Sequence, residues 1–235
     1  MNGDINPLVF IISAPSGSGK STLVEKLLEN VPDLEFSISY TTRPPRGSEK
    51  NSKQYYFIAR DQFEQMIKDD EFLEYADVFG NFYGTAKRFL REARDKGRDL
   101  LLDIDVQGAK IIQQKLPHAI SIFILAPDRQ TLEVRLRGRS EDKEEVIQRR
   151  LITASREIEN YDKYNYILVN DQLDESVARL EAIVRSERLL RSGRPRTEIE
   201  ERMLRWADQC RLENIRDRVQ PILASFVTSA TSSGH

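Results

Sequence analysis

Residues 8–22 constrain the possible fold more than any other part of the chain. An apolar run, Leu8–Ile12, is followed by a loop of small residues and then by a helical pattern that begins at Ser21. A run of branched residues of this length is typical of a central parallel strand buried on both faces. A strand, a small-residue loop and a helix in this order predict a phosphate-binding loop in a parallel α/β protein.

The loop has the residue types that a triphosphate site needs. Gly17 and Gly19 allow successive backbone N–H groups to point into one concavity, and the following helix adds its positive N-terminal end. Lys20 is expected to reach the β- and γ-phosphates, and the Ser21 hydroxyl to bind Mg²⁺. Ala14 stands where the first glycine of this pattern is usual. The predicted triphosphate-binding residues are Ala14, Pro15, Ser16, Gly17, Ser18, Gly19, Lys20, Ser21 and Thr22.

Three later apolar runs have the same strand character: 99–104, 119–125 and 166–169. Helical patterns near 86–96, 107–115, 129–137 and 172–190 alternate with them. This alternation predicts βαβ units, and therefore an α/β fold with a parallel sheet of the P-loop NTPase type flanked by helices.

Two stretches differ from this core in composition. One has short alternating runs such as Gln54–Ile58 and a helical pattern near 61–69, and the other is strongly charged and helical. We interpret them as an inserted lobe and a lid. The predicted organisation is core at 1–37, 97–134 and 161–190, lobe at 38–96, lid at 135–160, and a C-terminal helical extension with a disordered tail at 191–235.

Composition excludes several classes of protein. The net charge of −2 argues against a protein that coats nucleic acid, and the single cysteine, Cys210, excludes an internal disulfide framework. Two histidines are too few for a His/Cys metal cluster. The run Leu8–Ile12 is far shorter than the roughly 20 residues that span a bilayer. We therefore expect a cytoplasmic protein with no membrane or nucleic-acid partner.

A carboxylate at a strand end narrows the class of nucleotide-binding protein. Asp103 follows an apolar strand, where it is suited to bind the magnesium ion, usually through water. Asp105–Gly108 superficially matches the DxxG pattern of GTPases. No Asn-Lys-x-Asp sequence follows a later strand, which weakens the GTPase interpretation.

Two arginines favour a kinase. Arg43 and Arg46 lie in a proline-containing loop, and two guanidinium groups three residues apart suit a phosphate monoester. Tyr55 and Tyr83 can each donate a phenolic hydrogen bond to the same phosphate.

A second group of arginines, Arg135, Arg139, Arg149 and Arg150, lies in or near the charged lid. Arginines on a moving lid can close over a transferring phosphoryl group and offset its charge. The alternative is a solvated helix laced with ion pairs to Glu141, Asp142, Glu144 and Glu145. We prefer that alternative for Arg149 and the catalytic role for Arg139 and Arg150.

The sequence resembles the guanylate kinases in a series of motifs that occur in the family order. They cover about residues 8–190, and together they are far more specific than the phosphate-binding loop alone. The motifs are Ser13–Thr22, Ser39–Gly47, Tyr55–Phe57, Glu71–Glu74, Asn81–Thr85, Leu102–Gly108 and Val169–Asp171.

The resemblance implies a core, a GMP-binding lobe and a lid that close around GMP and MgATP. It also implies transfer of the γ-phosphoryl group of ATP to GMP, and to dGMP, in purine metabolism, with Asn170 at the ATP site. Lys20, Arg43, Arg139 and Arg150 are the expected catalytic residues, and Mg²⁺ is bound by Ser21 with Asp103 through water. The implied GMP site is Ser39, Arg43, Arg46, Tyr55, Glu74, Tyr83, Thr85, Asp103 and Asp105.

The chemistry of guanine supports the implied role of Glu74. A carboxylate accepts from both N1–H and the 2-amino group, and a hydroxyl of Ser39 or Thr85 can donate to O6. Adenine lacks the donor pair, and a mismatched buried polar group costs roughly 1–3 kcal/mol. The alternative is that Glu74 is an exposed acid next to the run Asp69–Glu71.

Residues 191–235 lie beyond the resemblance. Ile199, Met203, Trp206 and Cys210 recur at helical spacing, so this apolar stripe has to be covered either by the core or by a homodimer contact. Cys210 is expected to be a packed residue rather than a reactive thiol.

Two rival functions remain: a kinase for another monophosphate, such as a uridylate or cytidylate, and a scaffold module without turnover.

Overall fold

A computed structural model of the chain describes residues 6–47, 49–78, 80–139 and 143–227. The chain forms two compact units. Unit 1 is Met1–Ile12 with Pro32–Ile120, and unit 2 is Ser13–Val31 with Ser121–His235.

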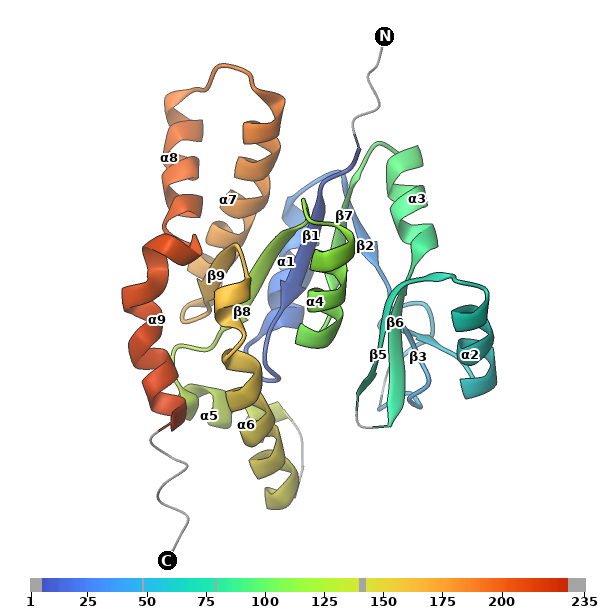
Figure 1. The fold of residues 1–235 in the computed structure, drawn as a ribbon. Helices are drawn as coiled ribbons and strands as arrows, with labels where there is room; N and C mark the ends of the chain where they lie inside the picture. The colour runs from blue at the N-terminus through green and yellow to red at the C-terminus, as the bar shows by residue number, and fades with distance from the viewer. Residues whose placement is uncertain (1–5, 48, 79, 140–142, 228–235) are drawn as a thin grey trace, which may run out of the picture. The chain divides into compact units, whose positions relative to one another are not determined.

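Unit 1 contains parallel strands in the order β2-β7-β1 (Figure 1). Strand β1 is Val9–Ser13, β2 is Leu34–Ser37 and β7 is Asp99–Asp103. β7 pairs in parallel with both neighbours. The side chains of 10–12 and 100–102 are completely buried, which explains why both segments are apolar at every position. The sequence analysis missed β2.

A second sheet of unit 1 forms the inserted lobe, with the strand order β4-β3-β6-β5. Phe63 stacks on Phe72 with ring centroids 4.4 Å apart, and these residues anchor the core of the lobe. The elements of the lobe are β3 (Tyr40–Thr41), β4 (Tyr56–Phe57), α2 (Arg60–Lys68), β5 (Phe72–Val78), β6 (Asn81–Ala86) and α3 (Lys87–Asp95). Outside the lobe, α4 (Val106–Lys115) follows β7.

Unit 2 contains the parallel pair β8 (Ile120–Leu125) and β9 (Tyr166–Val169), both buried along their whole length. The helices of this unit that the sequence predicts are α1 (Lys20–Asn30), α5 (Arg129–Arg139), α6 (Glu144–Ile158) and α7 (Leu173–Ser192). The prediction of parallel strands alternating with helices is confirmed.

The C-terminal extension adds α8 (Glu198–Asp208) and α9 (Leu212–Val227) to unit 2. α8 lies beside α7 (Figure 1), and it begins with a capping box between Thr197 and Glu200. The turn between α8 and α9 runs antiparallel to β9. Ile167 N–H donates to the carbonyl of Cys210 at 2.7 Å, and Leu212 N–H donates to that of Asn165 at 3.1 Å. These bonds cover an edge of β9.

Side chains strengthen this attachment. Arg211 donates to Glu187 of α7 at 3.1 Å, and its guanidinium lies 4.7 Å from the ring centroid of Tyr166. The Tyr166 hydroxyl donates to the same carboxylate. Burial, followed by the contact with Glu187, raises the pKa of Tyr166.

The apolar stripe is covered only in part within the chain, because Cys210 is fully buried whereas Ile199 is 71% exposed and Trp206 is 52% exposed. The Ser/Thr/Gly-rich composition from Ser225 onward predicts a disordered tail. This prediction is wrong for residues 225–227, which belong to α9, while residues 228–235 lie outside the described part of the chain. Cys210 is fully buried, and burial raises the pKa of its thiol to about 11, so the prediction of a packed residue is confirmed.

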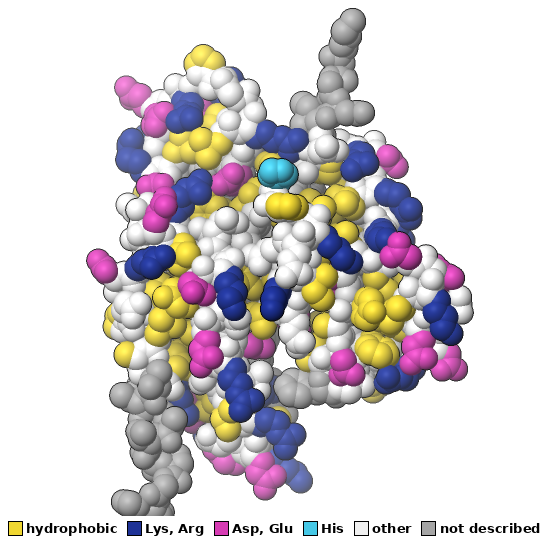
Figure 2. All heavy atoms as spheres, in the orientation of Figure 1, with side chains coloured by type: hydrophobic (Ala, Val, Ile, Leu, Met, Phe, Trp, Pro, Cys, Tyr) yellow, Lys and Arg dark blue, Asp and Glu magenta, His cyan; other side chains and the backbone are white. Residues whose placement is uncertain are grey.

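Charges of both signs are interspersed on the face drawn in Figure 2, with no single basic patch. In the extension, Arg194 pairs with Glu200, and Arg196 pairs with Glu201 at 3.5 Å. None of the helices in the described ranges is both long and apolar enough to cross a bilayer.

Candidate active site

The glycine-rich loop connects β1 to α1 and adopts the conformation that its glycines permit. Gly17 has a φ of +92° and Gly19 a φ of +88°, values that residues with a side chain rarely adopt. Gly19 is the N-cap of α1, so the loop ends directly at a helix N-terminus. Lys20 is the first residue of that helix and is half-buried, while Ser21 and Thr22 are exposed.

Asn170 holds this loop in place. It is 5% exposed, and its side-chain amide donates to the carbonyl of Ser18 at 2.8 Å. A Cβ atom at Gly19 would lie 2.3 Å from the same amide nitrogen, so a close approach as well as a positive φ requires glycine here. The sequence predicts Asn170 at the ATP site, and the structure places it against the loop.

A cavity of about 360 Å³ lies beside the loop. It is lined by Gly17, Gly19, Thr22, Arg135 and Asn170, among others. Arg135, on α5, donates to the carbonyl of Asn170 at 3.0 Å. One arginine of the lid group therefore belongs to the wall of this cavity.

The other lid arginines differ in exposure. On α6, Arg150 is half-buried and Arg149 is exposed, as the preference for a solvated Arg149 implies. The side chain of Arg139 and residues 140–142, which include Glu141 and Asp142, lie outside the described part of the chain.

Glu74 is buried in unit 1 beside Thr85. Strands β5 and β6 place the two residues opposite each other, and the Thr85 hydroxyl donates to the Glu74 carboxylate at 2.7 Å. Glu74 is 4% exposed and Thr85 is completely buried. Glu74 is therefore not a surface acid of the run Asp69–Glu71, and the Thr85 hydroxyl is directed at Glu74.

Asp105 approaches the same carboxylate from the N-terminus of α4. It caps this helix by accepting from Gly108 N–H at 2.8 Å. A Cβ atom at Gly108 would lie 2.8 Å from a carboxylate oxygen of Glu74, so only glycine leaves room for it. Burial, and to a lesser extent Asp105, raises the pKa of Glu74 to about 7, although the Thr85 hydrogen bond opposes the shift.

Arg43 forms the second cluster of unit 1. Its side chain is 7% exposed, and its Nε donates to the Tyr83 hydroxyl at 3.1 Å. The guanidinium lies 5.5 Å from the ring centroid of Tyr55, which contacts Tyr83 edge-to-face with centroids 5.8 Å apart. Three of the four predicted phosphate ligands, Arg43, Tyr55 and Tyr83, are therefore grouped together.

Glu49 completes this cluster and was missed by the sequence analysis. Its carboxylate accepts from Arg43 at 3.0 Å and from the backbone N–H of Arg46 at 2.8 Å. Although burial alone would raise it, the hydrogen bond from Arg43 lowers the pKa of Glu49. A carboxylate thus occupies donors that a phosphate would use. Only its position three residues after Arg46, in a basic loop, could have indicated this role.

The remaining predicted residues of unit 1 are Arg46, Ser39 and Asp103. The Arg46 side chain is exposed and forms no hydrogen bond or ion pair with the residues described. Ser39 is buried, and its carbonyl accepts from Tyr56 N–H at 2.9 Å. Asp103 ends β7 opposite Ile12 of β1.

The described residues include no group of three or more His, Cys, Asp and Glu side chains that could hold a metal ion. An Mg²⁺ ion bound with a nucleotide needs fewer protein ligands, because phosphates and waters fill most of its octahedral shell. The oxygen donors of Ser21 and Asp103 suit such an ion.

Comparison with known proteins decides the family. A family model described as "Guanylate kinase" matches residues 6–187. The chain belongs to the guanylate kinase family. The predictions of this family and of a P-loop NTPase-type α/β fold are confirmed.

The relatives are similar over most of their length. A guanylate kinase from Koribacter versatilis is 54% identical over 221 residues, which are 93% of this chain and 95% of that protein. One from Escherichia coli K12 is 48% identical over 183 residues, which are 77% of this chain and 88% of that protein. The Koribacter match is long enough to extend beyond residue 187, where the family model ends.

A solved structure of guanylate kinase from Anaplasma phagocytophilum has a TM-score of 0.65 to this chain and is 36% identical. It covers 77% of this chain, and the match spans 86% of that protein.

Proposed function

We propose that this guanylate kinase transfers the γ-phosphoryl group of ATP to GMP, and to dGMP, with ADP and GDP or dGDP as products. The buried Glu74 carboxylate is the observation that carries the choice of substrate. It lies between the Thr85 hydroxyl and the Asp105 carboxylate, so acceptors are concentrated where the two adjacent donors of guanine would bind. Adenine, which presents a lone pair at N1, would face a like-signed group there.

The GMP phosphate is assigned to Arg43, Arg46, Tyr55 and Tyr83. Arg43 is already buried and aligned by Tyr83, so binding costs little ordering of its side chain. Glu49 has to share or yield its hydrogen bonds to Arg43 when the phosphate binds. Ser39 and Asp103 are assigned to the remainder of the GMP site.

ATP is assigned to the loop Ala14–Thr22 and Asn170, with Mg²⁺ on Ser21 and, through water, on Asp103. The positive-φ glycines and the start of α1 supply backbone N–H donors for the phosphates. When bound, the Mg²⁺ ion neutralises charge on the phosphates and orients them.

The reaction requires no covalent intermediate, because the nucleophile is an anionic phosphate oxygen of GMP. Catalysis then consists of in-line positioning and neutralisation of charge by Lys20, Arg43, Arg139 and Arg150. Closure has to exclude water, which would otherwise hydrolyse ATP. A chain without structural disulfides is consistent with a place in cytoplasmic purine metabolism.

Substrate-resolved kinetics test this proposal. In one coupled assay with AMP, GMP, dGMP and UMP, we expect turnover with GMP and dGMP only. Preference for another monophosphate contradicts the substrate assignment, and absence of turnover supports the scaffold alternative.

Lys20→Met is expected to lower kcat at least 100-fold, because removal of one donor that stabilises the transition state typically lowers kcat by about this factor. The melting temperature should not change. Equal losses of activity and stability would contradict the role of Lys20.

We also propose that the exposed stripe of α8 binds a second copy of the chain. Together with α1 and α7, α8 encloses an apolar groove of about 860 Å³ in unit 2. Leu173, Ile199 and Trp206 in its lining are 42%, 71% and 52% exposed, and apolar patches of this kind mark protein contacts. Figure 2 shows apolar side chains among charged ones over α7 and α8.

The charges of the groove favour an identical partner. Arg202 and Arg205 have no ion pair among the described residues, and the same holds for Asp174 across the groove. Unpaired charges of both signs on one surface complement a second copy related by a two-fold axis.

Sedimentation of Ile199→Asp tests this contact, with Ile152→Asp, an exposed isoleucine on α6, as the matched control. We expect the wild type and the control to be dimers and Ile199→Asp a monomer. Trp206 is the only tryptophan, so its quenching by iodide should fall as protein concentration rises. A monomeric wild type at micromolar concentration would contradict the proposal.

A further inference from the structure

The C-terminal helix α9 is fixed to unit 2 by its own apolar face. Ile215, Val219, Ile222 and Phe226 recur at intervals of three and four residues, and all are buried. α9 packs against α5, α6 and β9. α9 itself lies beyond residue 187, where the match to the family model ends, whereas α5, α6 and β9 lie within it.

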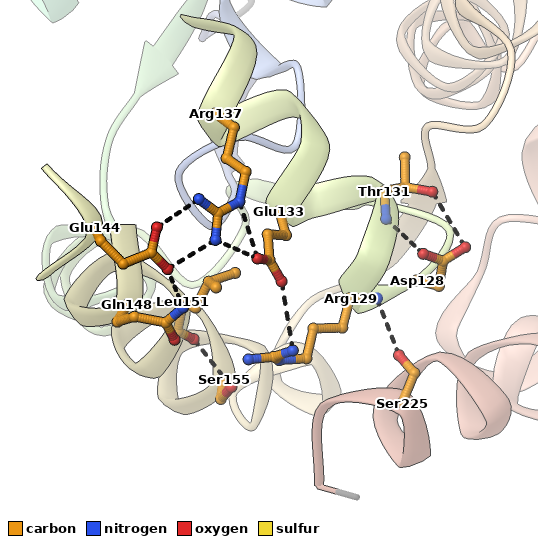
Figure 3. Close-up of polar contacts among 10 residues, drawn as sticks. All are labelled: Asp128, Arg129, Thr131, Glu133, Arg137, Glu144, Gln148, Leu151, Ser155 and Ser225. Atoms are coloured by element: carbon orange, nitrogen blue, oxygen red, sulfur yellow. Dashed lines mark hydrogen bonds and ion pairs between the residues drawn. The ribbon is translucent and has the colours of Figure 1, made fainter. Parts of the chain in front are cut away.

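A polar contact joins α9 to the start of α5. The backbone N–H of Arg129, the first residue of α5, donates to the Ser225 hydroxyl oxygen at 3.1 Å (Figure 3). The first N–H groups of a helix have no partner within the helix, so Ser225 satisfies one of them from outside. Asp128 satisfies another by accepting from Thr131 N–H at 2.6 Å. The N-terminus of α5 is therefore set by its own cap and by α9 together.

Further along its length, α5 contacts the phosphate-binding loop. Leu132 and Leu136 are buried, and a Cβ atom at Gly17 would lie 3.0 Å from the Leu136 side chain and 3.3 Å from that of Leu132. Arg135 adds the hydrogen bond to the Asn170 carbonyl, and Asn170 holds the carbonyl of Ser18. A displacement of α5 would thus reach the loop through packing and through these bonds.

We infer that α9 is a positioning element for the ATP site, acting through Ser225 and α5 on the phosphate-binding loop. Ser225 touches no substrate; it fixes the helix whose next turns pack on Gly17 and support Asn170. The inference rests on the proposed assignment of ATP to this loop, which Lys20→Met tests separately. It assigns a function to a segment that lies beyond residue 187, where the match to the family model ends.

The test is Ser225→Ala, with Ser192→Ala as the matched control. Both hydroxyls donate to the carbonyl three residues earlier near a helix end, Ser225 to Ile222 at 2.6 Å and Ser192 to Leu189 at 2.8 Å. Only Ser225 also bonds to α5. We expect the KM for ATP to rise about threefold in Ser225→Ala, as the loss of part of one hydrogen bond allows, while the KM for GMP and the melting temperature stay unchanged.

A third variant, Ser225→Thr, keeps the hydroxyl and should restore the KM for ATP. Equal changes in the KM values for ATP and GMP would overturn the inference. So would a loss of melting temperature without a change in KM, or the same result for Ser192→Ala. If Lys20→Met abolishes turnover and Ser225→Ala changes nothing, the ATP site stands and only the role of α9 is withdrawn.

Discussion

At the scale of single residues, Glu74 couples recognition of the guanine base to the release of a proton. Its carboxylate has to be ionised to accept both guanine donors, yet its pKa of about 7 leaves about half of it protonated at neutral pH. GMP binding should therefore release a proton from this group near neutral pH.

We expect the affinity for GMP to increase as pH rises from 6 to 8, after allowance for ionisation of the nucleotide phosphate. Glu74→Gln should bind GMP more weakly and remove this dependence, while ATP binding stays the same. Calorimetric titrations in two buffers of different ionisation enthalpy measure the proton release directly. An identical pH profile for wild type and variant would show that Glu74 does not accept from the base.

The same pKa affects stability. Because the folded-state pKa lies above the unfolded value, the contribution of Glu74 is fully present below pH 4.5 and is lost as pH rises through about 7. The shift from 4.5 to about 7 corresponds to about 3 kcal/mol in the free energy of unfolding. In urea unfolding of the ligand-free protein, the free energy of unfolding of Glu74→Gln should rise relative to that of the wild type as the pH increases from 4.5 to about 7. A constant difference between the two proteins would contradict the burial argument.

At the scale of elements, a row of ion pairs connects α5 to α6 (Figure 3). Arg129 and Arg137 both pair with Glu133 on α5, and Arg137 also makes a two-bond contact with Glu144 of α6 at 2.6 and 2.8 Å. The hydrogen bonds from Arg137, and then from Gln148, lower the pKa of Glu144 to about 2. The row begins at the same residue that binds Ser225.

Arg137→Gln should return the pKa of Glu144 toward 4.5, as measured by carboxyl chemical shifts in a pH titration. The stabilising effect of Arg137 should be present above pH 4.5, should vanish as pH falls through about 2, and should weaken in 1 M salt. Arg149→Gln, on the exposed side of α6, is the control and should leave Glu144 unchanged. A Glu144 pKa that stays near 2 in Arg137→Gln would show that Gln148 alone lowers it.

The elements also show what the sequence could and could not predict. The phosphate-binding loop was predictable because its chemistry lies in consecutive residues. The position of Glu74 was not, since an acid beside Asp69–Glu71 has a surface pattern and only the register of β5 with β6 buries it. The Ser225 contact joins positions 96 residues apart, and no local pattern marks either end. The packing of α9 was missed because Ser225 resembled the start of a polar tail.

At the scale of the whole molecule, the extension completes unit 2. A chain that ends at Gly193 loses the buried face of α9 and the cover of β9. We expect a lower melting temperature and aggregates that grow with time, because strand N–H and C=O groups left unpaired allow other chains to bind. Light scattering measures this, and deletion of 228–235 alone is the control, since it leaves every described helix in place. A truncated chain as stable and as small as the control would contradict this role.

The cover of β9 has a consequence for synthesis of the chain. Its pairing segment, Cys210–Leu212, leaves the ribosome only after about forty further residues have followed β9. At a synthesis rate of roughly 5–20 residues per second, the N–H and C=O groups at the outer edge of β9 stay unpaired for on the order of 2–8 seconds. During that interval the nascent polypeptide is most exposed to mispairing with its neighbours on the same messenger, and it is then that chaperone help would count most.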